Sequence, residues 1–466
     1  MVMRHPMAKY ALFVILSIGY MGCSYTLPAL VDSEPFLSYR LEMVDSNLNL
    51  VRVTGKVFGA LDSKVPLRLP EKGNGRGLDP LGLKAFDMDG RPLDVKREGD
   101  FWTIENSGRD FTFSYEVVLT IEDRYAAEVR GMISLLEEDR GRIMGRDVFL
   151  IPAIRFGDGV TLDVSLGHEG PVHSTWECID SRLIVPGVVD LATTLVVSGD
   201  YRVYETEVYG TRLTFAIAGK WSFSDDELFS VIRDVVSHEI GWFGSSTHKK
   251  HLFVCDTNPV KGGKGFDHYG VHFSGSILLL LDRRIDRSQI YDTPMSIVAH
   301  EFFHNWNGEA IRPASDGMMW FIEGATVYYS YRALTDINIL TSLQYDMRMK
   351  LIRQRFMDNP YLESVSISSA ANRDLSDKDM VNMLYDGGFL AAGIIDEKIA
   401  ELSGGRKGLI DVIRYLRDSN PDGCLLDEDK LCEALIQVTG HDFKAFMGEL
   451  VDTPAPLAIV SSEVSS

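Results

Sequence analysis

The chain has 466 residues, enough for two or three domains with sizeable cores. Its hydrophobic content of 45% and charged content of 24% are ordinary for a globular protein. The 47 lysines and arginines stand against 67 aspartates and glutamates, which gives a formal net charge of −20. Because nucleic acid is itself an anion, we expect no nucleic-acid partner.

Residues 1–23 are predicted to be a signal segment outside the fold. Basic residues precede a short apolar run, Tyr10 to Ile18, and Cys23 follows a glycine, as at a lipoprotein cleavage site. A run of this length suits a secretory signal better than a membrane span. We therefore expect an exported protein of the periplasm or cell envelope, attached to the membrane through a lipid on Cys23. A plain cleaved signal and an uncleaved anchor are the alternatives.

Without Cys23 the chain keeps four cysteines, Cys178, Cys255, Cys424 and Cys432. An even number permits disulfides in an exported chain without requiring them. A bond between Cys424 and Cys432 would close a small loop. No CxxC pair exists, so a cysteine zinc site is not expected.

Residues 30–218 are predicted to form an antiparallel β domain. Apolar and polar residues alternate from Leu48 to Val53 and from Phe111 to Val118, as in half-buried strands. Turn signals such as Asn106-Ser107-Gly108 separate these runs. Further strands are expected at 161–166, 194–197 and 212–218.

Residues 219–335 are predicted to form a second domain, which contains the motif described below. A helix from Asp225 to about Ile240 opens it, and apolar strands follow at His251 to Cys255 and Ile277 to Leu281. This helix contains His238-Glu239, the start of an H-E-x-x-H metal-binding pattern, but Trp242 occupies the position of the second histidine.

The remainder of the chain is predicted to be helical over residues 336–455. A turn is expected at Asp386-Gly387-Gly388, between two helices. Residues 456–466 are expected to be a disordered tail.

The chemistry is concentrated between Ser296 and Ser330. His300, Glu301 and His304 form the motif H-E-x-x-H in an apolar run that predicts a buried helix, so both imidazoles lie on one face. Glu323 follows after eighteen intervening residues in a second apolar run, where an unpaired carboxylate would be costly without a cation. Two imidazoles and a carboxylate form a common catalytic zinc set. We predict one Zn²⁺ per chain on His300, His304 and Glu323, with Glu301 taking a proton from the bound water.

The residues HEFFHNWN, IRP and WFIEGATVYY, from His300 to Tyr329, resemble the M61 family of zinc metallopeptidases, the glycyl aminopeptidase group of the gluzincin clan. Asn305 departs from the usual leucine, and Gly308-Glu309-Ala310 from the usual basic residues. The resemblance covers roughly residues 36–455. It implies an α+β multidomain fold: an N-terminal β domain, a thermolysin-like catalytic domain and a C-terminal α-helical region. The family's C-terminal PDZ domain is expected to be lacking.

The resemblance also implies further site residues. Tyr385 matches the tyrosine of the family's Tyr-x-Lys-Gly, which donates a hydrogen bond to the oxyanion of the tetrahedral intermediate. Gly265-Phe266-Asp267-His268 is similar to the family's G-G-L-E-H, whose acidic residue lies beside the substrate. Asp267 and His268 are therefore candidate substrate-binding residues, with a solvated loop aspartate as the alternative. His268 and His272 share a strand face too far apart to hold one ion, which favours ordinary cleft histidines.

The sequence thus predicts an exported zinc-dependent peptidase that acts on peptides or proteins. The resemblance implies an aminopeptidase preferring small N-terminal residues. An endopeptidase or dipeptidase of the same fold is one alternative, and a catalytically silent zinc-containing peptide-binding protein is another. The presence of Glu301 argues against the silent protein, because a pure binder has no need of a base.

Overall fold

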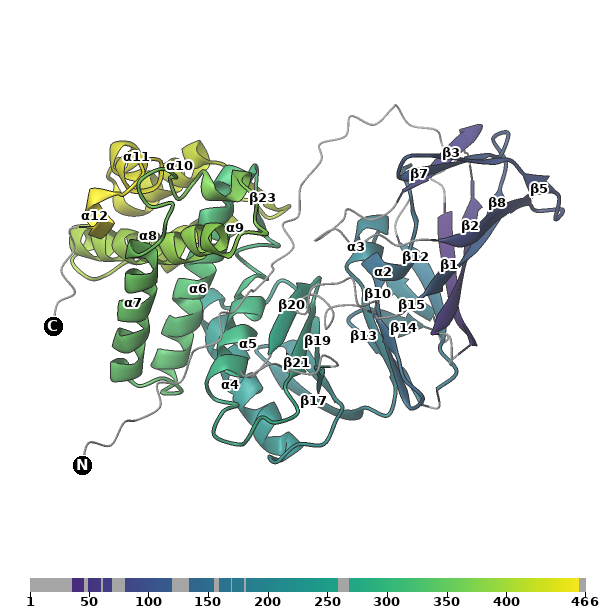
Figure 1. Ribbon diagram of the computed structural model, residues 1–466, viewed down its shortest axis with the longest axis horizontal. Coiled ribbons are helices and arrows are strands. Elements are labelled where there is room, and N and C mark those ends of the chain that lie inside the picture. The colour runs from purple at the N-terminus through teal and green to yellow at the C-terminus, as the bar shows by residue number, and fades with distance from the viewer. Residues whose placement is uncertain are drawn as a thin grey trace.

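The computed structural model describes residues 36–45, 49–59, 62–68, 80–119, 134–154, 159–168, 170–179, 182–258 and 268–460. Figure 1 shows β sheets from the N-terminal part at one end, a sheet with helices in the middle and packed helices at the other end. The predicted mixed α/β fold, with N-terminal sheets and a helical C-terminal region, is confirmed. The predicted signal segment 1–23 lies outside the described residues.

The N-terminal region is built around an eight-stranded sheet with the order β14-β15-β12-β1-β2-β8-β4-β5. The alternation of its strands buries one face: Phe111, Phe113, Tyr115 and Val117 all point into the core. The strands are β1 (Phe36–Asp45), β2 (Leu50–Phe58), β4 (Leu81–Asp87), β5 (Pro92–Leu93), β8 (Phe111–Val118), β12 (Val160–Ser165), β14 (Glu177–Ile179) and β15 (Arg182–Val185). β1 and β12 are parallel, so the predicted antiparallel domain contains a parallel pair.

Two four-stranded sheets complete this region, with the orders β13-β16-β10-β9 and β11-β3-β7-β6. Their elements are β3 (Lys64–Arg68), β6 (Val95–Glu98), β7 (Phe101–Glu105), β9 (Leu135–Leu136), β10 (Arg140–Met144), β11 (Ile151–Pro152), β13 (Val172–Ser174) and β16 (Leu195–Gly199), with the short helices α2 (Gly145–Val148) and α3 (Val188–Ala192).

A five-stranded sheet with the order β17-β18-β19-β21-β20 carries the middle region. Its strands are β17 (Arg202–Val208), β18 (Thr211–Ile217), β19 (Lys250–Thr257), β20 (Tyr269–Phe273) and β21 (Ser276–Leu281). β18 and β19 are parallel and are joined by the helix α4 (Asp225–Phe243), as a parallel connection requires. Residues up to 218 were predicted to belong to the β domain, whereas β17 and β18 are hydrogen-bonded into this middle sheet.

The helices of the middle and C-terminal regions pack around one continuous core. They are α5 (Thr293–Phe303), α6 (Met319–Asp336), α7 (Ser342–Met357), α8 (Lys378–Ser403), α9 (Leu409–Asp418), α10 (Glu428–Thr439), α11 (Lys444–Val451) and α12 (Leu457–Val460), with 3-10 turns η2 (Asp316–Met318) and η3 (Ala370–Asn372) and a small parallel pair, β22 (Ile311–Pro313) and β23 (Cys424–Leu426). Within the predicted tail, residues 456–466, the structure has the short helix α12, whose Ile459 is buried in the core. Residues 461–466 lie outside the described residues.

The predicted turn at Asp386-Gly387-Gly388 is wrong, because α8 runs through it without interruption. The two glycines instead make room for neighbours. A Cβ on Gly388 would lie 2.4 Å from the Trp320 carbonyl oxygen, and one on Gly324 would lie 2.1 Å from the Gly388 carbonyl carbon. α6 and α8 therefore cross in backbone contact.

Cys178, Cys255, Cys424 and Cys432 are all free thiols, so the disulfide considered for Cys424 and Cys432 is not formed. Within the described ranges, none of the helices has the length and apolar content that crossing a bilayer requires.

Candidate metal centre and active site

Two packed helices bring the three predicted ligands together. His300 lies in the last turn of α5, and His304 follows the helix with φ −61° and ψ −16°, so the i, i+4 relation of a helix is kept. Glu323 lies in the second turn of α6. The apolar residues that predicted buried helices, such as Phe302 and Phe321, are fully covered and hold α5 against α6.

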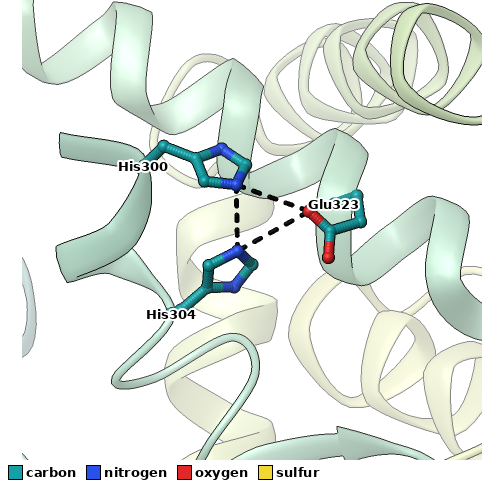
Figure 2. A group of neighbouring side chains, drawn as sticks. All are labelled: His300, His304 and Glu323. Carbon is teal, nitrogen blue, oxygen red and sulfur yellow. Dashed lines mark hydrogen bonds and ion pairs between the residues drawn. The ribbon is translucent and has the colours of Figure 1, made fainter. Parts of the chain in front are cut away.

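The donor atoms of these side chains point at one another (Figure 2). The Nε2 atoms of His300 and His304 are 3.0 Å apart, and Oε2 of Glu323 lies 3.4 and 3.6 Å from them. Zinc held tetrahedrally at about 2.0–2.1 Å separates its ligands by about 3.3 Å. All three residues are 4% exposed or less. The set therefore fits a single buried zinc ion.

The charges of these three residues are also compatible with a bound metal ion. Burial would raise the pKa of Glu323, yet His304 and His300 hold it well below its usual range. Burial also lowers the pKa of His300 to about 4, so this imidazole is neutral at pH 7. Burial opposes protonation of His304, but the charge of Glu323 raises the pKa of His304 to about 9, so a proton on His304 balances the Glu323 carboxylate. A bound metal cation would take the place of that proton.

Asn307 fixes both ligand-bearing helices. The Nδ1–H of His304 donates to the backbone carbonyl of Asn307 at 2.8 Å, which leaves Nε2 as the ligating atom. The Asn307 amide donates to the carbonyls of Phe321 and Ile322 at 3.2 and 2.9 Å, which lie two residues and one residue before Glu323, respectively. It also contacts the Thr326 hydroxyl at 3.2 Å. Asn307 belongs to the motif quoted above, but this role was not predicted from the sequence.

Glu301 lies beside the ligands with 1% exposure. Burial raises its pKa to about 7 and the charge of Glu323 adds to this, while His304 and the backbone amide of His272 oppose it. Neither carboxylate oxygen has a hydrogen bond of normal geometry from the described residues. The edge strand β20 passes directly over it, since a Cβ on Gly270 would lie 3.0 Å from Glu301 Cγ. A carboxyl with this pKa is suited to exchanging protons near neutral pH.

The other predicted site residues have different outcomes. Tyr385, on α8, is brought to the site: its ring centroid lies 6.4 Å from that of His300. His268 is buried, its Nδ1 accepts from the Asp282 amide at 3.2 Å, and burial lowers its pKa to about 4. The contact with Asp282 holds His268 in place at the start of β20. Asp267 lies outside the described residues.

The fold is similar to that of two solved aminopeptidases. An aminopeptidase N family protein from Idiomarina loihiensis superimposes with a TM-score of 0.76 and 19% identity, covering 90% of this chain and 76% of that one. Aminopeptidase A of Legionella pneumophila, solved with aspartic acid, gives a TM-score of 0.56 and 13% identity over 91% of this chain and 50% of that one. The chain therefore shares the fold of these proteins, and its buried cluster is a candidate metal site.

The sequence comparison names the family. Residues 293–387, which contain the whole cluster and Tyr385, match the profile described as M61 glycyl aminopeptidase, so the resemblance to this family is confirmed. No curated protein matches the chain by sequence. These findings support a peptidase function.

Proposed function

We propose that this protein is a zinc-dependent metallopeptidase, most closely an aminopeptidase. The observation that carries the proposal is the buried convergence of His300, His304 and Glu323 with Glu301 beside them. These three residues would hold the ion, which when bound lowers the pKa of a water and polarises the scissile carbonyl.

The chain's own groups supply the proton transfers and the charge stabilisation. Glu301 accepts the proton of the attacking water and returns it to the departing amine, for which a pKa of about 7 is well matched. The Tyr385 hydroxyl donates a hydrogen bond to the oxyanion that develops on the substrate. This contact exists only in the transition state and therefore accelerates the reaction.

The arrangement supports a thermolysin-like catalytic domain. The strand β20 lies over Glu301 and is last in the order of its sheet among the described strands, so an extended peptide can add beside it as a further strand. One solved neighbour belongs to the aminopeptidase N family and the other is an aminopeptidase A, which favours cleavage at a free N-terminus over an endopeptidase or dipeptidase. The M61 match favours small N-terminal residues. Export, with a lipid on Cys23, completes the proposal.

The test combines metal analysis with substrates. Wild-type protein should contain one zinc per chain and cleave aminoacyl reporters but not their N-acetyl forms. Glu301→Gln should lower kcat by at least about 1000-fold with zinc content unchanged, since it removes the proton acceptor and no ligand. Cleavage of acetylated peptides would indicate an endopeptidase instead. Zinc without any hydrolysis would indicate a binding protein, and absence of zinc would refute the proposal.

A further inference from the structure

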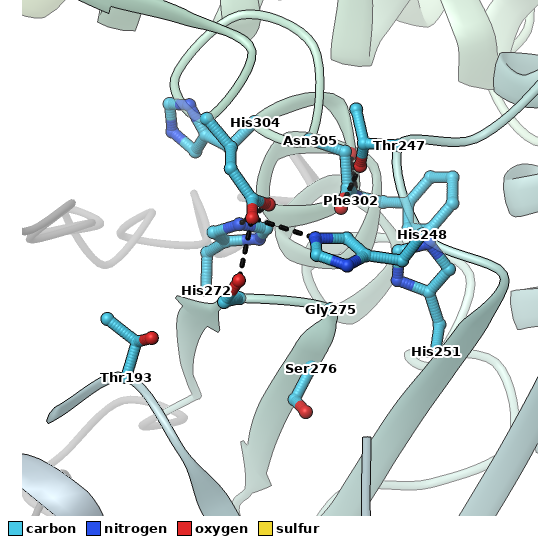
Figure 3. Close-up of polar contacts among 12 residues, drawn as sticks. Thr193, Thr247, His248, His251, His272, Gly275, Ser276, Phe302, His304 and Asn305 are labelled. Carbon is cyan, nitrogen blue, oxygen red and sulfur yellow. Dashed lines mark hydrogen bonds and ion pairs between the residues drawn. The ribbon is translucent and has the colours of Figure 1, made fainter. Parts of the chain in front are cut away.

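A second polar cluster lies beside the candidate metal centre and takes no part in the chemistry proposed above. It consists of Glu309, His248, His272 and Ser274, and is called the Glu309 cluster below. Figure 3 shows two of its members, His248 and His272, with His304 of the metal set near them. The side chains come from the loop after α4, from the end of β20 with the turn that follows it, and from the loop after α5.

Two short contacts hold one carboxylate oxygen of Glu309, whereas the other oxygen has a single long contact. Oε1 of Glu309 receives the Ser274 hydroxyl and His248 Nε2, both at 2.7 Å. Oε2 has a long contact, to His272 Nε2 at 3.4 Å. Burial opposes ionisation, but both imidazoles hold the pKa of Glu309 well below its usual range. The Glu309 side chain is 28% exposed, so part of it can be reached from solvent, and Oε2 has lone-pair capacity left for another donor.

This carboxylate is next to the reacting groups. The backbone N–H of Glu309 donates to the His304 carbonyl at 2.8 Å, and the His272 and His304 ring centroids are 6.2 Å apart. His272 lies two residues after Gly270, the residue of β20 that abuts Glu301. A peptide lying along β20 would therefore pass within reach of Glu309.

The charges around Glu309 are mixed. Asp190 adds a second carboxylate from the α3 side, and burial lowers but Glu309 and Asp190 together raise the pKa of His248, which is the cationic partner of Glu309. The chain carries a net charge of −20. An ionised carboxylate that is oriented but incompletely satisfied, in a partly desolvated wall, is a strong acceptor for an ammonium group.

We propose that Glu309 binds a positively charged group of the substrate beside the scissile bond, and that it thereby sets substrate preference. The inference rests on the proposed peptidase function and adds a specificity residue to it. An ammonium group has two sources in a peptide, the free α-amine or a basic side chain next to the cleaved bond. The experiment separates them.

The first arm measures hydrolysis. Glu309→Gln keeps the size and the acceptor oxygen but removes the charge, and Glu309→Lys reverses it. Glu433→Gln, an exposed position on α10, is the control for net charge. The substrates are alanyl, lysyl and glutamyl reporters, together with N-acetyl-alanyl and N-acetyl-lysyl peptides. We expect Glu309→Gln to lower kcat/KM by about 10- to 100-fold for the substrates that carry the recognised cation, with unchanged zinc content.

The pattern of the loss identifies the source. An equal loss for every free-amine reporter, with acetylated peptides unaffected, assigns Glu309 to the α-amine. A loss confined to lysyl substrates assigns it to a basic side chain, and Glu309→Lys should then improve glutamyl substrates. A uniform loss for acetylated and free, basic and neutral substrates would overturn the proposal, because it is the mark of a residue that only holds the loop.

The second arm does not depend on turnover. Alaninamide, lysinamide and N-acetylalaninamide are titrated by calorimetry into zinc-loaded wild type and Glu309→Gln. The proposal is supported if either cationic amide binds more weakly to the variant than to the wild type while N-acetylalaninamide binds equally to both. This outcome would support the proposal even if the wild type hydrolysed no substrate, a result that would refute only the peptidase function. Equal binding of both cationic amides to the two proteins overturns it.

Discussion

At the scale of single residues, Asn307 is the group whose removal should reveal how the metal centre is supported. Its amide ties the start of α6 to the turn that holds His304. Asn307→Ala should weaken zinc binding by about 10- to 100-fold, since the carbonyl that orients His304 loses its anchor. Competition against a chromogenic chelator measures this affinity.

The matched control is the neighbouring Asn305→Ala. Asn305 is equally buried, but its amide bonds to Phe302 and its carbonyl to Thr247, neither of which is a predicted ligand. An equal loss of zinc affinity in both variants would mean that general destabilisation, and not ligand positioning, is measured.

Glu239 gives a pH prediction independent of the metal. It is fully buried in α4, its carboxylate oxygens have no hydrogen-bond partner among the described residues, and burial raises its pKa well above the usual value. The folded state therefore keeps a proton that the unfolded chain releases above about pH 4.5, so stability falls as pH rises from there towards the folded pKa. Glu239→Leu should remove a slope of up to about 1.4 kcal/mol per pH unit from the free energy of unfolding.

Urea titrations at pH 5, 6 and 7 measure that slope for wild type, Glu239→Leu and the exposed control Asp234→Asn on the same helix. The control should follow the wild type. Parallel pH profiles for the wild type and Glu239→Leu would mean that Glu239 titrates normally in the fold.

Residue types and spacing were enough to predict that His300, His304 and Glu323 come together, because helical geometry links the two histidines and a buried carboxylate needs a positive partner. Tyr385 required the family resemblance, since spacing along the chain does not reveal which distant phenol the fold brings beside His300. The Glu309 cluster was beyond prediction because its members come from separate parts of the chain that only the fold brings together.

At the scale of elements, the crossing of α6 and α8 is the feature most sensitive to a single methyl group. Gly388→Ala would place a Cβ 2.4 Å from the Trp320 carbonyl oxygen, so the helices must separate. We expect a loss of about 3 kcal/mol or more in the free energy of unfolding. Zinc affinity should fall as well, because Glu323 lies on the displaced helix.

Gly448→Ala on α11 is the control, because its Cβ would meet nothing within 4 Å. Alanine should stabilise that helix by about 0.5–1 kcal/mol. Chemical denaturation measures both variants, and similar effects of the two substitutions would contradict the close-crossing argument.

Strong periodicity made most elements predictable: the expected helix from Asp225 and the strand Ile277 to Leu281 match α4 and β21 closely. The turn predicted at Gly387 and Gly388 was wrong because a glycine in a sequence has more than one structural meaning. It marks a turn when the chain needs a positive φ, and a close contact when another backbone lies against it, and only the position of α6 decides between them.

At the scale of the whole molecule, the N-terminal sheets and the middle sheet are joined beside the site. The Thr175 hydroxyl donates to the Gly275 carbonyl at 2.8 Å, and Lys250 Nζ donates to the Ser174 carbonyl at 2.6 Å. The ring of Trp176 lies edge-on to His248 of the Glu309 cluster. The N-terminal region therefore supports the loops that surround the candidate site.

A buried cluster of charged residues also joins the N-terminal region to the middle sheet. Asp256, at the end of β19, accepts from Arg142 at 2.9 Å and contacts Arg140 at 3.3 Å, and both arginines lie on β10 of the N-terminal region. The Tyr201 hydroxyl donates to the same carboxylate at 3.3 Å. Asp256 and Arg142 are each 1% exposed, so removing one charge leaves the other without compensation in the core.

Asp256→Asn should therefore cost about 3–5 kcal/mol in the free energy of unfolding, whereas the exposed Asp234→Asn should change it by less than about 0.5 kcal/mol. If the cluster couples the two regions, wild type should unfold in one calorimetric transition, and Asp256→Asn should show an earlier transition for one region. Reporter hydrolysis should fall at the temperature of that first transition, because the loops around His248 lose their support when the regions separate. A variant that unfolds like the wild type would show that the sheets are joined by their apolar contacts, with the ion cluster contributing little.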